Sequence, residues 1–127
     1  MAGSSNAHRL GRRGELLATE YFAEAGYVIV ARNWRGAAGE VDLVVRDIAK
    51  ARPDLVFCEV KTRTTDRWGR PAEAVTPTKQ RRLRRLAAEF LASGHGGDAA
   101  SVRFDVVEVL WPDGSSEPVL RHLADAF

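Results

Sequence analysis

Residues 39–61 of this chain read GEVDLVVRDIAKARPDLVFCEVK, and this stretch decides the fold. It contains two apolar segments, residues 40–47 and 55–62, whose β-branched residues and alternation predict two strands joined by a charged turn. Three ionisable residues interrupt the strand patterns: Asp42, Glu59 and Lys61. Strand interiors exclude charge unless the charge is paired or binds a metal. The stretch therefore predicts either a chemical site or an exposed sheet face.

The second of these strands indicates where such a site would lie. One of its faces carries Leu55 and Phe57 and then changes to Glu59 and Lys61, whereas the other face is apolar. Because both faces begin apolar, the strand is expected to be central and covered on both sides. The charges follow where the strand leaves the core, and strand ends at the rim of a buried sheet are common sites of function.

The remaining sequence predicts two helices. Apolar residues recur at helical spacing over about residues 8–25, and Gly26 is expected to end this helix as a C′ glycine. Residues 1–7 are small and polar, so they are expected to be disordered. A second helix is predicted over residues 77–93, with Thr76 as its N-cap and a proline in its first turn.

Strands alternate with these helices in a recognisable order. Alternation in residues 40–47 assigns Val41, Leu43 and Val45 to one face. Residues 63–75 are rich in charge, glycine and proline, and they predict a loop long enough to carry function. Further strands are expected over residues 27–33, 101–111 and, at a sheet edge, 118–123. The fold class is therefore α/β: an αβββαβ core with an antiparallel meander and a parallel crossover, forming one domain over residues 8–127.

Composition limits the class of protein. A length of 127 residues, 45% hydrophobic residues and 28% charged residues fit one soluble globular domain. The single cysteine, Cys58, excludes an internal disulfide and a cysteine-rich zinc module. Because no apolar run is long enough for a signal peptide or a membrane span, we expect a cytoplasmic protein that does not bind membranes.

Charge is distributed unevenly along the chain. Residues 1–97 contain 17 lysines and arginines against 11 acids, whereas residues 98–127 contain two against six. The first two turns of the second predicted helix are basic without one acid, which opposes the helix dipole. Contact with phosphate explains this pattern, and a solvated basic face is the alternative. The candidate nucleic-acid-binding residues are Lys79, Gln80, Arg81, Arg82, Arg84 and Arg85, together with Arg35 and Arg63 beside the strand ends.

The spacing of the two acids and the lysine is consistent with phosphodiester chemistry. Asp42 and Glu59, on adjacent strands, would offer hard oxygen ligands to Mg²⁺ or Mn²⁺, and the backbone carbonyl of Val60 could add another. Lys61 lies on the same strand face as Glu59, where it can stabilise charge on a phosphate or position the attacking water. The pattern alone is weak, because exposed strands often alternate glutamate and lysine. Glu15, at the border of the first helix's apolar stripe, could reach a neighbouring strand or point into water.

The chain also resembles a known family in several spaced motifs. The YraN-like bacterial family is similar to this sequence over about residues 10–111, with FDVVEV and the terminal ADAF also fitting. The motifs are GRRGELLATEYFAEAGYVIVARNWRGAAGEVDLVV, LVFCEVKTR, WGRPAEAV and TKQRRL. That family is assigned to the PD-(D/E)XK restriction-endonuclease-like superfamily and is similar in pattern to archaeal Holliday-junction resolvases.

The resemblance implies a mixed-sheet nuclease core with Asp42, Glu59 and Lys61 in the active-site positions. It also implies that Glu15 is the helical acid that completes the site and could be a further metal ligand, and resolvase-like relatives suggest a homodimer. We therefore expect a metal-dependent endonuclease acting on DNA, including branched or structured DNA. The alternative is a nucleic-acid-binding or assembly factor that keeps the fold without catalysis. Trp34 and Trp68 flank the expected site, where they could stack on bases or pack over the sheet edge.

Overall fold

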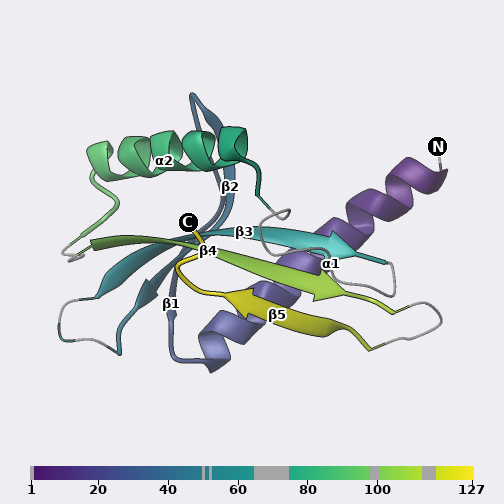
Figure 1. Cartoon of the computed structure of the whole chain (residues 1–127). Helices are drawn as coiled ribbons and strands as arrows, with labels where there is room; N and C mark the ends of the chain where they lie inside the picture. The colour runs from purple at the N-terminus through teal and green to yellow at the C-terminus, as the bar shows by residue number, and fades with distance from the viewer. Residues whose placement is uncertain (1, 50, 52, 65–74, 98–100, 113–116) are drawn as a thin grey trace.

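The structure is a computed structural model that describes residues 2–49, 51, 53–64, 75–97, 101–112 and 117–127, with side chains from His8 onward. Most of the predicted loop 63–75, including Trp68, lies outside the described residues. Within these described residues, two helices and five strands form the fold (Figure 1). Their bounds are α1 Ala2–Glu24, β1 Val28–Gly36, β2 Gly39–Asp47, β3 Asp54–Arg63, α2 Pro77–Ala92, β4 Ser101–Leu110 and β5 Val119–Leu123.

The strands form one mixed sheet in the order β1-β2-β3-β4-β5. Strands β1, β2 and β3 are antiparallel, β4 is parallel to β3, and β5 is antiparallel to β4. The crossover between β3 and β4 passes through α2, which begins at Pro77 behind the Thr76 N-cap. The predicted meander, parallel crossover and edge strand are therefore confirmed, and the architecture is the α/β core expected from the sequence.

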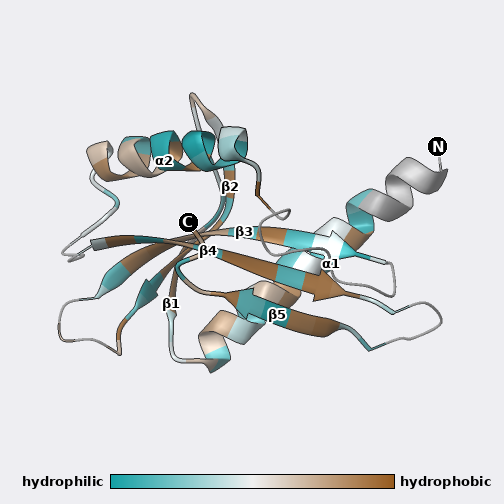
Figure 2. Ribbon diagram, in the orientation of Figure 1, coloured by the Kyte–Doolittle hydropathy of each residue, from teal (hydrophilic) through white to brown (hydrophobic). Residues whose placement is uncertain are grey.

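A helix covers each face of the sheet (Figure 1). Leu55 and Phe57 of β3 pack in the cluster that includes buried α2 residues, whereas Val56 and Cys58 pack with Ala18 and other α1 residues. Apolar residues accordingly dominate the middle of β3 and β4, while hydrophilic residues dominate the first part of α2 (Figure 2). The prediction that β3 is central and buried on both faces is confirmed.

Two sequence-based expectations need correction. Helix α1 begins at Ala2 rather than near His8; residues 3–6 read GSSN, whose low helix propensity hides this start. Val41 was expected to share a face with Leu43 and Val45, but it packs with Val44 in the cluster under α2. At this point β2 pairs only with β1, and two-stranded ribbons twist more strongly than strands inside a sheet. The twist turns the Val41 side chain toward the sheet face under α2, so the strict alternation of faces does not hold at this position.

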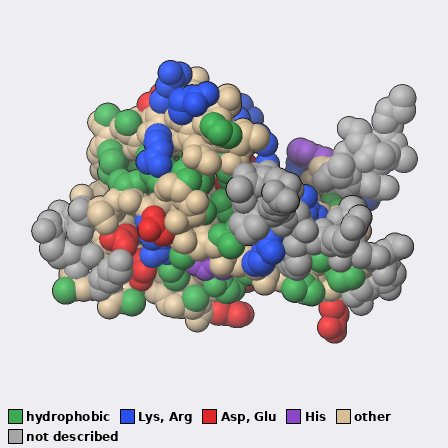
Figure 3. Space-filling view, viewed as in Figure 1, with side chains coloured by type: hydrophobic (Ala, Val, Ile, Leu, Met, Phe, Trp, Pro, Cys, Tyr) green, Lys and Arg blue, Asp and Glu red, His purple; other side chains and the backbone are tan. Residues whose placement is uncertain are grey.

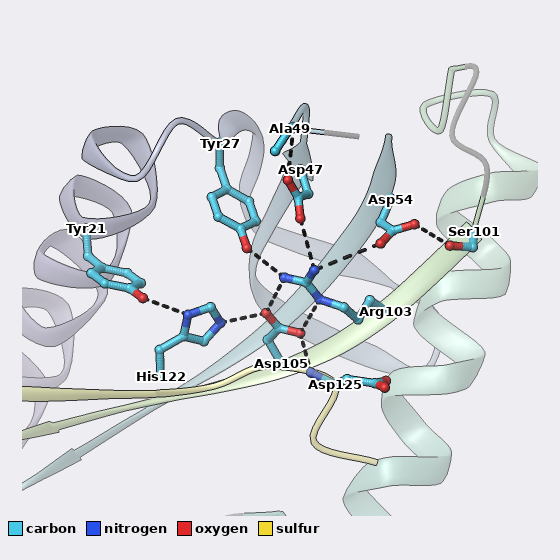
Figure 4. A network of polar contacts seen from close by, with 10 residues as sticks. All are labelled: Tyr21, Tyr27, Asp47, Ala49, Asp54, Ser101, Arg103, Asp105, His122 and Asp125. Carbon is cyan, nitrogen blue, oxygen red and sulfur yellow. Dashed lines mark hydrogen bonds and ion pairs between the residues drawn. The ribbon is translucent and has the colours of Figure 1, made fainter. Parts of the chain in front are cut away.

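Buried ion pairs join β4 to its neighbours at one end of the sheet (Figure 4). Arg103 donates two hydrogen bonds to the fully buried Asp105, at 2.9 and 2.8 Å, and a third to the Tyr27 hydroxyl at 2.8 Å. His122 Nε2 lies 2.6 Å from Asp105 Oδ2, and its Nδ1 lies 2.8 Å from the Tyr21 hydroxyl. Because each charge has partners, this network is structural rather than a free site.

A second buried acid anchors the end of β3. Glu108 is fully buried and forms ion pairs with Arg63, at 3.0 Å, and with Arg121. A buried carboxylate without a cation would be strongly destabilising, so these arginines offset its loss of hydration. Arg63, a candidate nucleic-acid-binding residue, therefore already has a structural partner.

No helix among the described residues is long and apolar enough to cross a membrane.

Candidate active site

The site forms where β2 separates from β3. The two strands pair from Asp47–Asp54 to Leu43–Cys58, and residues Gly39–Asp42 continue in β2 beside β1 alone. At the point of separation, Asp42 Oδ2 accepts a hydrogen bond of 2.8 Å from the backbone N–H of Val60. The side chain thus replaces the lost backbone partner, and this bond holds the Asp42 carboxylate beside Glu59.

Glu59 is the most perturbed acid of the site. It is only 8% exposed, and its Oε1 lies 3.8 Å from Lys61 Nζ. Its Oε2 is buried and has no hydrogen-bond partner among the described residues. Burial, and then the charge of Asp42, raises the pKa of Glu59 to about 7. Burial also raises the pKa of Asp42, against the effect of the Val60 hydrogen bond.

Cations from α2 face these acids. Burial and then the nearby Lys79 lower the pKa of Lys61, so the two lysine side chains lie close together. Arg82, one helical turn after Lys79, carries a charge that lowers the pKa of both Asp42 and Glu59. Its aliphatic stem packs over Gly39, where an added Cβ would lie 3.2 Å from Arg82 Cδ. The basic start of α2 therefore belongs to the same site as the acids.

The other polar side chains at the basic start of α2 point elsewhere. The Gln80 side chain donates to the Val75 carbonyl at 3.2 Å, and Arg81 donates to the Thr78 hydroxyl at 3.3 Å. The Arg84 guanidinium lies 4.9 Å from the centre of the Phe104 ring. Arg81, Arg84 and Arg85 are exposed. Lys and Arg side chains gather over α2 and form a basic surface there (Figure 3). Their contact with nucleic acid stays a prediction.

Helix α1 approaches the site through a glycine. A Cβ on Gly14 would lie 2.1 Å from Thr62 Oγ1, so only glycine allows the helix to pack this closely on β3. The adjacent Glu15 is brought within electrostatic reach of the acids: burial, and then Asp42 and Glu40, raise its pKa. Nevertheless, no group of three or more His, Cys, Asp or Glu side chains among the described residues is close enough to hold one metal ion.

Sequence reasoning missed Asn33. The Asn33 amide is assigned the flipped orientation, in which its nitrogen meets acceptors; it then donates to Glu15 Oε1 at 2.9 Å and to Glu40 Oε1 at 3.0 Å. Its φ of 52° is unusual for a residue with a side chain, although asparagine tolerates it best. The only sequence signal was an asparagine at the end of an apolar strand. Asn33 thereby joins Glu40, which also pairs with Arg35 at 3.3 Å, to the helical acid.

The hairpin that carries Glu40 and Asp42 is fastened to α2. Glu89 Oε1 accepts the Ala37 N–H at 2.8 Å, and Oε2 accepts the Ala38 N–H at 3.2 Å. A Cβ on Gly36 would lie 2.7 Å from Glu89 Oε2, so glycine permits this contact. Trp34 packs edge to face on Phe90, with ring centres 5.1 Å apart. These contacts fix the free end of β2 to the helix that supplies Lys79 and Arg82.

The donor set fits a hard divalent cation. Mg²⁺ is commonly bound through one or two carboxylates and retains several waters, which suits a pair rather than a cage. The buried and unpartnered Oε2 of Glu59 is the type of oxygen that such an ion would satisfy. Asp42 and Glu59 are thus the residues that could hold a metal, and the Val60 carbonyl stays a predicted further ligand.

Comparison with known proteins places the chain in a family. The model of a family described as "Uncharacterised protein family UPF0102" matches residues 14–109. The chain belongs to the UPF0102 family. UPF0102 proteins of Frankia alni and Rhodococcus jostii are 52% and 51% identical to it over 118 residues, which cover 93% of this chain and 93% and 95% of the relatives. A UPF0102 protein of Anaeromyxobacter dehalogenans is 48% identical over 118 residues, covering 93% and 83%.

Family membership confirms the resemblance to the YraN-like proteins. The UPF0102 match spans α1 from Gly14 to β4 at Val109, so it includes Glu15, Asp42, Glu59 and Lys61. The names of these relatives state no activity. Nuclease activity, DNA as the partner and the homodimer therefore stay predictions.

Proposed function

We propose that this UPF0102 protein is a metal-dependent endonuclease that hydrolyses phosphodiester bonds in DNA. The observation that carries the proposal is the convergence of Asp42, Glu59 and Lys61 at the opening between β2 and β3. Two partly buried acids and a lysine, with Lys79 and Arg82 facing them, form a site for a cation and a phosphate. A structural ion-pair network would instead leave each buried carboxylate oxygen satisfied, whereas Glu59 Oε2 has no hydrogen-bond partner in the part of the chain that the structure describes.

The acids would hold the metal. Asp42 and Glu59 supply the carboxylate oxygens, with Val60 as a candidate carbonyl ligand. A bound Mg²⁺ or Mn²⁺ supplies Lewis-acid polarisation of the phosphoryl group and lowers the pKa of a bound water. The Val60 N–H holds the Asp42 carboxylate in place, so that it need not reorganise when substrate arrives. Burial of both acids keeps the local dielectric low, which strengthens their interaction with a cation.

The cations of the chain act on the phosphate. Lys61 Nζ can donate a hydrogen bond to a non-bridging oxygen and stabilise the negative charge that grows there in the transition state. Lys79 and Arg82 hold the neighbouring backbone phosphates and orient the strand. Hydrolysis then forms a bond from water oxygen to phosphorus and breaks the bond from phosphorus to one sugar oxygen. The water gives up one proton, and the leaving oxygen takes up one proton.

The test measures cleavage directly. The purified protein is incubated with labelled linear, flapped and four-way DNA, and with RNA of the same sequence, in Mn²⁺ or in EDTA. We expect Mn²⁺-dependent cleavage of DNA that is lost in Asp42→Ala and in Glu59→Ala. Glu24→Ala, which removes an exposed acid at the end of α1, is the matched control and should cleave normally.

The same assay identifies the rival function. Salt-sensitive binding without cleavage by any form, unaffected by Asp42→Ala and Glu59→Ala, would overturn the enzyme and favour a nucleic-acid-binding factor. Cleavage that persists in both acid variants would show that another site, or a contaminant, carries the activity.

A further inference from the structure

A cavity of about 500 Å³ with charged side chains in its lining lies next to Glu40, the β2 residue two positions before Asp42. Helix α1 forms one wall through Arg12 and Glu15, and strand β1 forms another through Arg32 and Asn33. Glu40 connects the cavity to the site, because it lines the cavity and lies two residues before Asp42 on strand β2. A strand bound over Asp42 and Glu59 would therefore pass directly into this cavity or out of it.

The lining combines guanidinium donors with carboxylate acceptors, and one of each, Arg35 and Glu40, form an ion pair at 3.3 Å. Arg12, Arg32 and Arg35 surround the cavity and offer guanidinium groups, which bind phosphate in forked geometry. Glu15 and Glu40 lie together and are bridged by the Asn33 amide. Guanidinium groups suit a phosphate, and carboxylates accept hydrogen bonds from the amino groups of a base.

The conformation of Asn33 indicates that the cavity wall formed by β1 is held in place by specific contacts. A side chain at φ 52° costs conformational free energy, and such residues persist where the surrounding structure holds them. Here the two glutamates hold Asn33, at 2.9 and 3.0 Å. The bridge fixes helix α1 relative to β1 and keeps the cavity open between them.

We propose that this cavity binds an unpaired nucleotide of a single DNA strand, next to the phosphodiester that is cut. This inference rests on the proposed endonuclease function and narrows its substrate. A volume of about 500 Å³ is that of a small-ligand site, within the usual range of about 300–1,000 Å³. A duplex cannot enter such a space, but one nucleotide can, with its phosphate on the arginines and its base edge toward the glutamates.

The basic surface over α2 differs from the cavity in shape. Arg81, Arg84 and Arg85 are exposed on the outside of a helix, where a duplex can lie against them (Figure 3). Lys79 and Arg82 of the same helix carry charges that act on Asp42 and Glu59, so the basic helix adjoins the acid site. The arrangement selects DNA in which a duplex meets a single-stranded segment, such as an overhang or a flap, over a blunt duplex.

The test compares two DNAs with the same duplex, one blunt and one with a short single-stranded overhang of either polarity. Binding of the whole protein is measured in EDTA by fluorescence anisotropy over a salt series. We expect tighter binding of the overhang DNA by the wild type. In the Arg12→Ser/Arg32→Ser double variant this preference should disappear, and the slope of log affinity against log salt should become shallower by about 0.7, the value for one lost single-strand phosphate contact.

The control is a double variant with the same change in charge. Arg9→Ser/Arg13→Ser alters the same helix outside the cavity lining, and Arg13 instead stacks over Trp111 at 5.0 Å. It should keep the overhang preference. If both double variants lose it equally, or if neither loses it, the cavity does not bind the single strand and the inference is overturned.

The two proposals fail in different ways. Mn²⁺-dependent cleavage with equal activity on blunt and overhang DNA would overturn the cavity inference and leave the endonuclease standing. An overhang preference that depends on Arg12 and Arg32, without cleavage of any DNA, would support the cavity and overturn the endonuclease. A wild-type protein that binds none of the DNAs would overturn both.

Discussion

The Asp42 carboxylate accepts the backbone N–H of Val60 at 2.8 Å, at the place where β2 and β3 stop pairing. In a continuous ladder, that N–H would bond to the neighbouring strand. Here a side chain takes over the acceptor role, so the sheet can open without leaving the donor unsatisfied. The opening exposes an edge with two acids and a lysine, which an unbroken sheet would not form.

Divalent cations should stabilise the protein through this pair of acids. A ligand at 100 times its dissociation constant adds about 2.7 kcal/mol of stability, so Mn²⁺ should raise the melting temperature by several degrees. In Asp42→Asn and Glu59→Gln the increase should be absent. Thermal unfolding with and without Mn²⁺ measures it, with Glu24→Gln as the control. An equal increase in all four proteins would show that Mn²⁺ binds elsewhere.

Gly14→Ala should lower the free energy of unfolding, whereas Gly11→Ala in the same helix should raise it. Gly14→Ala places a methyl group 2.1 Å from Thr62 Oγ1, and overpacking of this type costs about 1–3 kcal/mol. Gly11→Ala meets nothing within 4 Å and should stabilise the helix by about 0.5–1 kcal/mol. Urea unfolding gives both values.

The Gly14 effect has an internal check. Thr62→Ala removes the hydroxyl that the new methyl group would meet, so Gly14→Ala should cost less in the Thr62→Ala background than in the wild type. A double-mutant cycle with no coupling between the two positions would show that the contact is not the cause.

Glu89 should hold the β1–β2 turn on α2. Glu89→Ala removes the acceptor of the Ala37 and Ala38 amides, and we expect a loss of about 1–2 kcal/mol of stability. Hydrogen exchange should accelerate at these two amides more than in the middle of β3. Glu89→Gln keeps one acceptor oxygen, so its stability should lie between that of the wild type and that of Glu89→Ala. Unchanged exchange at Ala37 and Ala38 in Glu89→Ala would contradict the anchor.

The buried Asp105 should stabilise the protein at neutral pH, and this contribution should be lost in acid. Burial alone would raise its pKa, but hydrogen bonds from His122 and Arg103 together with the Asp125 N–H hold that pKa below its usual value. A depressed pKa means that the unfolded chain binds the proton more readily. The contribution of Asp105 is therefore present above about pH 4, the range of an unfolded aspartate, and is lost as the pH falls through the lower folded pKa.

Asp105→Asn tests this sign. The variant should be less stable at pH 7, because Arg103 loses its buried carboxylate, and its stability should fall less steeply between about pH 4 and pH 2. Denaturant unfolding over a pH series measures both effects. If the free energy of unfolding of the variant falls as steeply below about pH 4 as that of the wild type, other carboxylates cause the loss of stability in acid.

Local pattern was sufficient for most of the fold. Helical spacing located α1 and α2, alternation located the strands, and the Thr76 cap and Pro77 identified the start of α2. The change in β3 from Phe57 to Glu59 also indicated where the core ends. Each of these signals depends on neighbours in the chain, which is why one sequence can reveal them.

The candidate site was only partly predictable. Asp42, Glu59 and Lys61 were recognisable as charges inside strand patterns, and the structure brings them together. The buried Asp105 and Glu108 also lie inside a strand pattern, yet their arginine partners make them structural. Sequence alone could not separate the two cases, because the difference lies in which cations reach each acid.

The sequence by itself determined the elements, their order and the positions of the unusual charges, since these follow from local periodicity. Only the tertiary structure decided that Val41 turns under α2, that Asn33 bridges Glu15 to Glu40, and that a cavity opens beside these two glutamates. These features depend on contacts between segments far apart in the chain, and on the twist of β2 where it leaves β3. Packing geometry of that kind has no local signature in the sequence.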